Sequence, residues 1–150
     1  MQSHKEEAKA LAKNIVGAAI EVHRTLGPGL LHNAYLACLC RELMLRGIPF
    51  ERDVSLATEY KGMPLECGCR GDLVVDELVL VQVVADPTSR EVAESGMRTS
   101  LRLSELWLGL VIDFSVDVLD HGVRLIANEW PIREEAVTCC CLSSDAGLMG

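Results

Sequence analysis

The fold is decided by one stretch of the chain, which reads Cys67-Gly68-Cys69-Arg70-Gly71-Asp72-Leu73-Val74-Val75-Asp76-Glu77-Leu78-Val79-Leu80-Val81-Gln82-Val83-Val84-Ala85. The acidic pair Asp76-Glu77 separates two aliphatic runs, 73–75 and 78–85, as a turn separates adjacent strands. The second run has almost no polar alternation, so we expect both of its faces to be covered, as in a central strand. The stretch predicts a β-hairpin inside a mixed sheet with helices on it, in an α/β (α+β) domain.

Two polar side chains interrupt this apolar hairpin. Asp72 stands where the first strand begins, and Gln82 lies inside the second. A buried carboxylate or amide needs a hydrogen-bond partner, a metal ion or a site to serve. For Asp72 a structural pair with Arg70 is an equally good interpretation.

The arrangement resembles the PD-(D/E)XK nuclease superfamily, which implies a restriction-endonuclease-like core, a mixed central β-sheet flanked by helices. In that superfamily an Asp on one strand and a Glu-x-Lys on its hairpin partner place Mg²⁺ and a water beside a phosphodiester. Carboxylates are hard ligands for Mg²⁺, and a Lys two residues on shares the strand face. The matching positions here read Asp72, Gln82 and Val84, so the Asp is present while the Glu and the Lys are replaced.

Two helices are predicted before the hairpin, over 3–26 and 30–46, because apolar residues recur at helical spacing. The segment 15–47 resembles the GxxExxY family, a small bacterial group within that superfamily. Gly29 and Tyr35 match its naming motif, and His32 stands where the motif has Glu. The resemblance also implies that Glu21, on the first helix, points into the nuclease site, although a helix Glu is most often solvated.

Histidines in this segment invite a metal or catalytic interpretation. A lone His on a helix is more often a surface or hydrogen-bonded residue, and we favour that interpretation for both His32 and His23.

The remaining pattern predicts strands over 50–60 and 63–69, which with the hairpin make a meander of four strands. A helix is expected over 90–103, a buried strand over 106–114, and over 116–126 a turn at 120–122 with a short final strand. The resemblance places a site Gln and Tyr at Gly96 and Ser100, so we expect an apolar cavity relined by these two residues and Val84.

Seven cysteines occur in this chain, including a triplet at 139–141. Free thiols are the simpler interpretation, because C-x-C pairs leave too little spacing for an ordinary zinc site. A thiolate metal or redox site remains the alternative, with four candidates: Cys38, Cys40, Cys67 and Cys69.

Composition limits the partners. The formal net charge is −8 and the four lysines form no basic run, which disfavours tight binding to a phosphate backbone. No secretory signal or membrane-spanning run is recognised, so a cytoplasmic protein is expected. We expect residues 1–130 to form the nuclease-like domain and 131–150 a flexible tail containing cysteines.

These observations favour a catalytically inactive nuclease-fold protein that works as a binding or self-assembly module, with a protein partner or a second copy and no cofactor. One alternative is a residual nuclease acting on DNA or RNA, with Mg²⁺ or Mn²⁺ held by Glu21 and Asp72 together with Gln82. The second alternative is the cysteine-based metal or redox protein.

Overall fold

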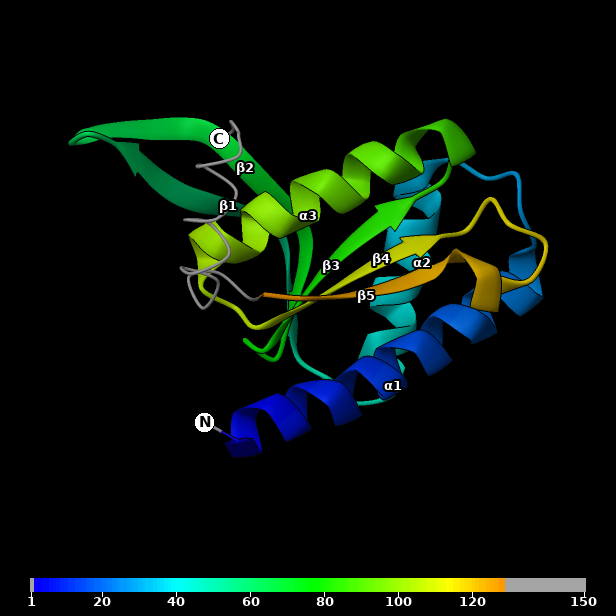
Figure 1. The fold of residues 1–150 in the computed structure, drawn as a ribbon. Helices are drawn as coiled ribbons and strands as arrows, with labels where there is room; N and C mark the ends of the chain where they lie inside the picture. Colours follow the sequence, from blue (N-terminus) through cyan, green and yellow to red (C-terminus); the bar gives the residue numbers. More distant parts are fainter. Residues whose placement is uncertain (1, 129–150) are drawn as a thin grey trace, which may run out of the picture.

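The computed structural model describes residues 2–128, which form a five-stranded mixed sheet with helices on both faces (Figure 1). The helices are α1 (Gln2–Leu26), α2 (His32–Leu45) and α3 (Arg90–Ser104), with two short 3-10 turns, η1 (Pro87–Ser89) and η2 (Leu119–Gly122). The strands are β1 (Phe50–Tyr60), β2 (Met63–Val75), β3 (Val79–Val84), β4 (Leu108–Asp113) and β5 (Val123–Ala127). The predicted α+β class, a mixed sheet flanked by helices, is confirmed.

The strands lie in the sheet in chain order, β1-β2-β3-β4-β5. Only β3 and β4 are parallel, and α3 makes the crossover between them; the other neighbouring pairs are antiparallel. Because β3 and β4 run the same way, their carboxyl ends meet at one edge of the sheet.

The hairpin predicted at residues 73–85 is confirmed. Asp76 and Glu77 both adopt positive φ, 51° and 57°, and the Leu78 N–H donates to the Val75 carbonyl, which closes a tight turn. All residues of β3 are buried except the half-buried Gln82, so both faces of this strand are covered as expected.

The predicted strand over 63–69 does not stand alone. It continues without a break through Gly71 to Val75, so the meander has three strands before the crossover, not four. Gly71 suits this extended path, because a Cβ there would lie 2.6 Å from Leu80 Cδ1 and the leucine side chain would have to shift. The missing side chain lets the strand pass close beneath β3.

The outer part of β1 and β2 is a two-stranded ribbon. The strands pair from Phe50↔Val75 to Tyr60↔Met63, with a register shift between Leu56 and Thr58. The recorded pairs of β3 reach only residues 73–75 of β2, so the rest of the ribbon extends past the sheet (Figure 1).

The hydrophobic core has one cluster on each side of the sheet. Residues of α1 and α2, among them Ile15 and Leu39, pack on one face, and α3 contributes Met97 and Leu101 to the other. No helix within 2–128 combines the length and the hydropathy that a membrane span requires. Residues 129–150, and with them the tail expected at 131–150 and its cysteine triplet, lie outside the described part of the chain.

Candidate functional site

Asp72 is a residue of β2. It lies at the end of the sheet where the carboxyl ends of β3 and β4 meet. Its Oδ2 atom accepts a hydrogen bond from the backbone N–H of Val83, at 2.8 Å. The same atom lies 2.9 Å from Nε2 of His32, the first residue of α2. The carboxylate, whose side chain is 14% exposed, is therefore held by one amide and one imidazole.

The loop between α1 and α2 sets the position of His32. Tyr35 donates its hydroxyl hydrogen to the Gly27 carbonyl and accepts from the Leu30 N–H at 3.1 Å, so one side chain ties both ends of the loop. Gly29 has φ 110°, a conformation that side chains other than glycine rarely adopt. The two matched motif residues thus shape the loop that presents His32.

Both ring nitrogens of His32 face oxygen acceptors. Nδ1 lies 3.1 Å from Asn33 Oδ1, and Nε2 faces Asp72, which is the pattern of a doubly protonated imidazolium. Burial alone lowers the pKa of His32, but the hydrogen bond and the charge of Asp72, with help from Asn33 and Asp53, raise it above its ordinary value. The hydrogen-bonded interpretation fits the surroundings of His32, and Asp72 favours the protonated form of its ring.

Val84 occupies the position where the resemblance expects a lysine. It is 3% exposed and packs against the α3 side of the sheet with Leu80, Met97 and Leu101. An aliphatic side chain in this cluster can neither orient nor deprotonate a water molecule.

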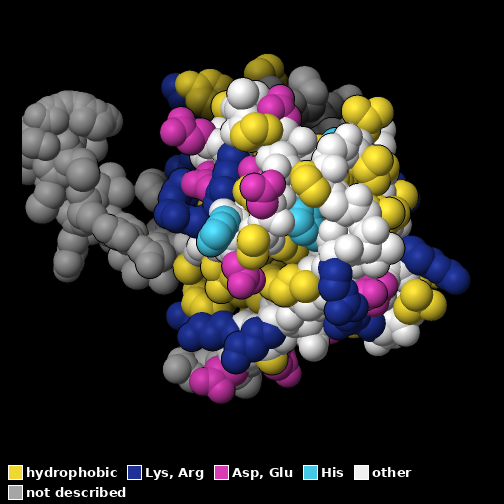
Figure 2. Space-filling model, turned by 90° about the vertical axis from the view of Figure 1, so that its right-hand side faces the viewer, with side chains coloured by type: hydrophobic (Ala, Val, Ile, Leu, Met, Phe, Trp, Pro, Cys, Tyr) yellow, Lys and Arg dark blue, Asp and Glu magenta, His cyan; other side chains and the backbone are white. Residues whose placement is uncertain are grey.

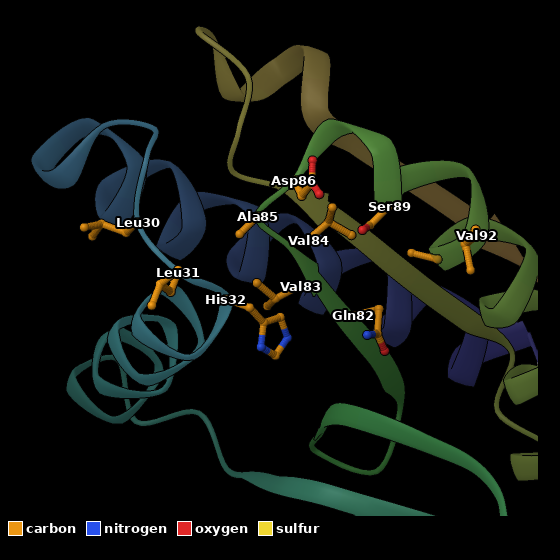
Figure 3. A pocket seen from close by; sticks show the side chains of 11 residues that line it. Leu30, Leu31, His32, Gln82, Val83, Val84, Ala85, Asp86, Ser89 and Val92 are labelled. Atoms are coloured by element: carbon orange, nitrogen blue, oxygen red, sulfur yellow. The ribbon is translucent and has the colours of Figure 1, made fainter.

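A pocket of about 500 Å³ opens beside Asp72, between the beginnings of α2 and α3 (Figure 3). In this view His32 and Gln82 lie in the middle, Leu30 and Leu31 on one side, and Ser89 and Val92 on the other. The full lining is Leu30, Leu31, His32, Gln82, Val83, Val84, Ala85, Asp86, Ser89, Val92 and Ala93.

Of the three residues expected to line the site cavity, Val84 lines this pocket. Gly96 and Ser100 are not among the lining residues; Gly96 is exposed, and Ser100 is buried. The α3 residues that line the pocket belong to the first turn of the helix. The helix runs across the sheet, so only its beginning lies near the carboxyl ends of β3 and β4.

Glu21 lies in a different hollow. Its carboxylate pairs with Arg24 one turn along α1, and it lines a pocket of about 220 Å³ with Cys38, Arg41 and Glu42. The structure does not bring Glu21 together with Asp72 and Gln82, and its side chain is 40% exposed, as expected of a solvated helix glutamate. The direction of a helix face depends on how α1 packs on its neighbours, which local sequence does not encode.

The cysteines on α2 are free thiols. Cys38 and Cys40 are two residues apart on a helix and so do not face each other. Burial raises the pKa of the Cys40 thiol, which makes this thiol a poor nucleophile and a poor metal ligand at neutral pH. The side chains of Cys67 and Cys69, and that of Arg70 with its expected pair to Asp72, lie outside the described side chains.

Asp113 is a buried carboxylate that the sequence pattern did not single out. It ends β4, is 1% exposed, and its Oδ1 accepts from both the N–H and the hydroxyl of Ser115. The Asp-x-Ser spacing directly after a buried strand is the local signal for this turn. His23, also buried, lies 2.8 Å through Nε2 from the Val116 carbonyl and so holds the same connection against α1.

The donors at this edge do not match a magnesium site. Among the residues described, no group of three or more His, Cys, Asp or Glu side chains is placed to hold a metal ion. Mg²⁺ prefers several oxygen ligands, whereas Asp72 shares its Oδ2 with an imidazole and an amide N–H.

A comparison with family models gives one match. The model described as the PD-(D/E)XK nuclease superfamily matches residues 9–126. No curated protein matches the chain. Among solved structures there is likewise no match.

Proposed function

The chain belongs to the PD-(D/E)XK nuclease superfamily, and we propose that it keeps the nuclease fold without nuclease catalysis and acts as a binding or self-assembly module. Within the superfamily we assign it to the GxxExxY group, on the strength of Gly29 and Tyr35. The observation that carries the proposal is the hydrogen bond between His32 and Asp72.

The pair supports loss of catalysis by a charge argument. A metal ion in such a site neutralises the carboxylates that hold it, and here the Asp72 carboxylate already faces the imidazole of His32, whose pKa it raises. A divalent cation bound through Oδ2 would have to displace this ring, and the protonated ring would repel a cation bound through the other oxygen. Gln82 supplies an amide where a second carboxylate is needed, and Val84 supplies no proton acceptor.

Surface charge supports the same proposal. Figure 2 shows the end of the molecule at which the α1–α2 and β4–η2 connections lie, with acidic, basic and apolar side chains interspersed on it. This face carries no continuous basic area, and the whole chain has a formal net charge of −8. Proteins that hold a phosphate backbone normally gather Lys and Arg on one surface. A protein partner or a second copy in the cytoplasm suits this surface better.

Nuclease assays with Mg²⁺ and with Mn²⁺ on single-stranded DNA, duplex DNA and RNA test the proposal. We expect no cleavage above that of a protein-free control. Turnover that disappears in Asp72→Ala but persists in Asp76→Ala, a change to an exposed carboxylate at the far end of the hairpin, would overturn it.

Calorimetric titration with Mn²⁺ gives a second, independent readout. The native chain is expected to show no stoichiometric uptake, whereas His32→Glu combined with Gln82→Glu restores two carboxylates beside Asp72 and should take up one ion. Stoichiometric uptake by the native chain that Asp72→Ala abolishes would contradict the proposal. Light scattering over a range of protein concentrations reports self-assembly directly.

A further inference from the structure

Strand β1 lies at one edge of the sheet. It is the first strand in the sheet order, so within residues 2–128 its backbone pairs with β2 on one side only. The strand is 11 residues long, and its outer part belongs to the ribbon that extends past the sheet (Figure 1). An edge strand presents a row of unpaired N–H and C=O groups, which makes it a template for pairing with another strand.

The regular part of this edge has two defined ends. Asp53 and Lys61 both adopt positive φ, 51° and 50°, and so interrupt the extended backbone on either side of residues 54–60. The register shift of the ribbon adds its extra residues on β2, because Ala57 stands against residues 66–68, so the β1 backbone stays regular between the two ends. The regular edge is therefore symmetric about Ala57.

Two such edges match each other in antiparallel orientation. When Ala57 lies opposite its own copy, Val54 of one chain lies opposite Tyr60 of the other, and directly opposite residues share a face of the sheet. Val54 is half-buried against the core cluster on the α3 side, and Tyr60 is 57% exposed. The contact would cover this exposed ring with a β-branched side chain, one of the favourable cross-strand pairs.

Charge selects the same register. Asp53 and Lys61 are exposed, and neither forms an ion pair with a described side chain. Pairing about Ala57 sets each Asp53 opposite Lys61 of the other copy. An axis at Leu56 would instead set Asp53 opposite Glu59, and like charges directly opposite are destabilising. An axis nearer the β1–β2 turn would leave part of the regular edge without a partner.

We propose that two copies of this chain associate through their β1 edges, which pair antiparallel about Ala57 and join the two sheets into one. The contact is isologous, so each favourable pair occurs twice. The main-chain hydrogen bonds come from residues 54–60, and the pairs at its ends fix the register. This inference rests on the proposed self-assembly role and names the surface and the register that carry it.

Charge reversal in two complementary variants tests the register. Sedimentation velocity from about 1 µM to about 1 mM protein should show a monomer–dimer equilibrium of the native chain. Asp53→Lys sets lysine opposite lysine and Lys61→Asp sets aspartate opposite aspartate, so each variant alone should weaken the dimer about tenfold or more. A mixture of the two variants should regain the native affinity, because every charge in the mixed dimer again meets its opposite.

Asp76→Lys is the matched control. Asp76 is exposed and has φ 51° like Asp53, but it lies in the β2–β3 turn, outside the proposed contact. This variant changes the net charge as Asp53→Lys does and should leave the dimer unchanged. A second measurement needs no variant: in a mixture of isotope-labelled and unlabelled native chains, an intermolecular NOE should join the Val54 methyl groups to the Tyr60 ring.

Four results would overturn the inference. They are a native chain that stays monomeric over this range, a mixture of the two reversed variants that stays dissociated, equal weakening by Asp76→Lys, and a dimer without the NOE between Val54 and Tyr60.

The inference and the proposed function can fail separately. If the chain is monomeric and no metal-dependent cleavage is found, the β1 contact is wrong and the loss of catalysis stands. Cleavage that depends on Asp72 would instead remove the proposed function, whether or not the dimer forms.

Discussion

His32 and Asp72 form a charge pair whose strength depends on pH. The pKa of His32 is raised in the folded protein, so the pair stabilises the fold fully below the unfolded value of about 6.5 and loses this effect as pH rises through the higher folded value. We expect His32→Gln to lower the free energy of unfolding by about 0.5–1 kcal/mol at pH 6, the range of a partly exposed ion pair, and by less at pH 9.

Urea titrations of both proteins at the two pH values measure this difference. His121→Gln, a change to an exposed histidine of η2, serves as the control and should show no such dependence. A His32→Gln effect that is constant with pH, or larger at pH 9, would mean that the ring is not held as a cation.

Two glycines should respond to alanine in opposite directions. Gly96 is in α3, and an added Cβ would meet nothing within 4 Å, so Gly96→Ala should stabilise the protein by about 0.5–1 kcal/mol through reduced backbone entropy of the unfolded chain. At Gly122 an added Cβ would lie 2.2 Å from the Asp113 carbonyl oxygen, so Gly122→Ala should cost about 1–3 kcal/mol. Thermal unfolding of both variants measures the signs, and a stabilised Gly122→Ala would show that η2 is packed less closely against β4.

At the scale of elements, the sheet divides into a covered centre and a ribbon that pairs only with itself. Every residue of β4 is buried, whereas β2 pairs with β3 only at residues 73–75, so the outer parts of β1 and β2 pair with each other alone. Two-stranded ribbons are marginally stable in water, and local opening is cheapest where few contacts must break. We expect the amides of β4 to exchange hydrogen at least a hundredfold more slowly than those of residues 58–65.

Hydrogen exchange followed by NMR gives these rates residue by residue. Slow exchange throughout 58–65 in the monomer would contradict the expectation. Protection that appears there only at high protein concentration would place a self-assembly contact on the ribbon.

At the scale of the whole molecule, the two core clusters share β3 and β4 and should unfold together. Leu39 lies in the cluster with α1 and α2, Leu101 in the cluster with α3, and both are fully buried. Each change to alanine should cost about 2–5 kcal/mol, and because the sheet separates the two sites the costs should add to within about 0.5 kcal/mol.

Equilibrium unfolding followed by circular dichroism and by tryptophan fluorescence measures the free energy of unfolding of the two single variants and the double variant. Coincident transitions in both single variants and the double variant are expected of one cooperative domain. Separate transitions in either variant would show that α3 and its cluster fold independently of the α1–α2 side.

Much of the fold follows from local pattern. The turn at Asp76-Glu77, the covered strand β3 and the three helices are set by backbone preference and by spacing of apolar residues, and these signals span only a few neighbours. The separate strands expected over 63–69 and 73–75 were wrong, because in the structure residues 70–72 continue one extended strand in which Gly71 lies close to Leu80. The substitution of Gln82 and Val84 for the nuclease residues is likewise visible in the sequence alone.

The sequence by itself therefore determined the type of domain, the central hairpin and the loss of two residues that nuclease chemistry requires. Only the tertiary structure decided that His32 reaches Asp72 forty positions away, that Glu21 lies in a different hollow, and that Gln82 lines the same pocket as His32. The physical reason is the range of the interactions along the chain. Periodicity and turn preference act between sequence neighbours, whereas the partner of a charged or polar side chain depends on how α1, α2 and α3 pack across the sheet.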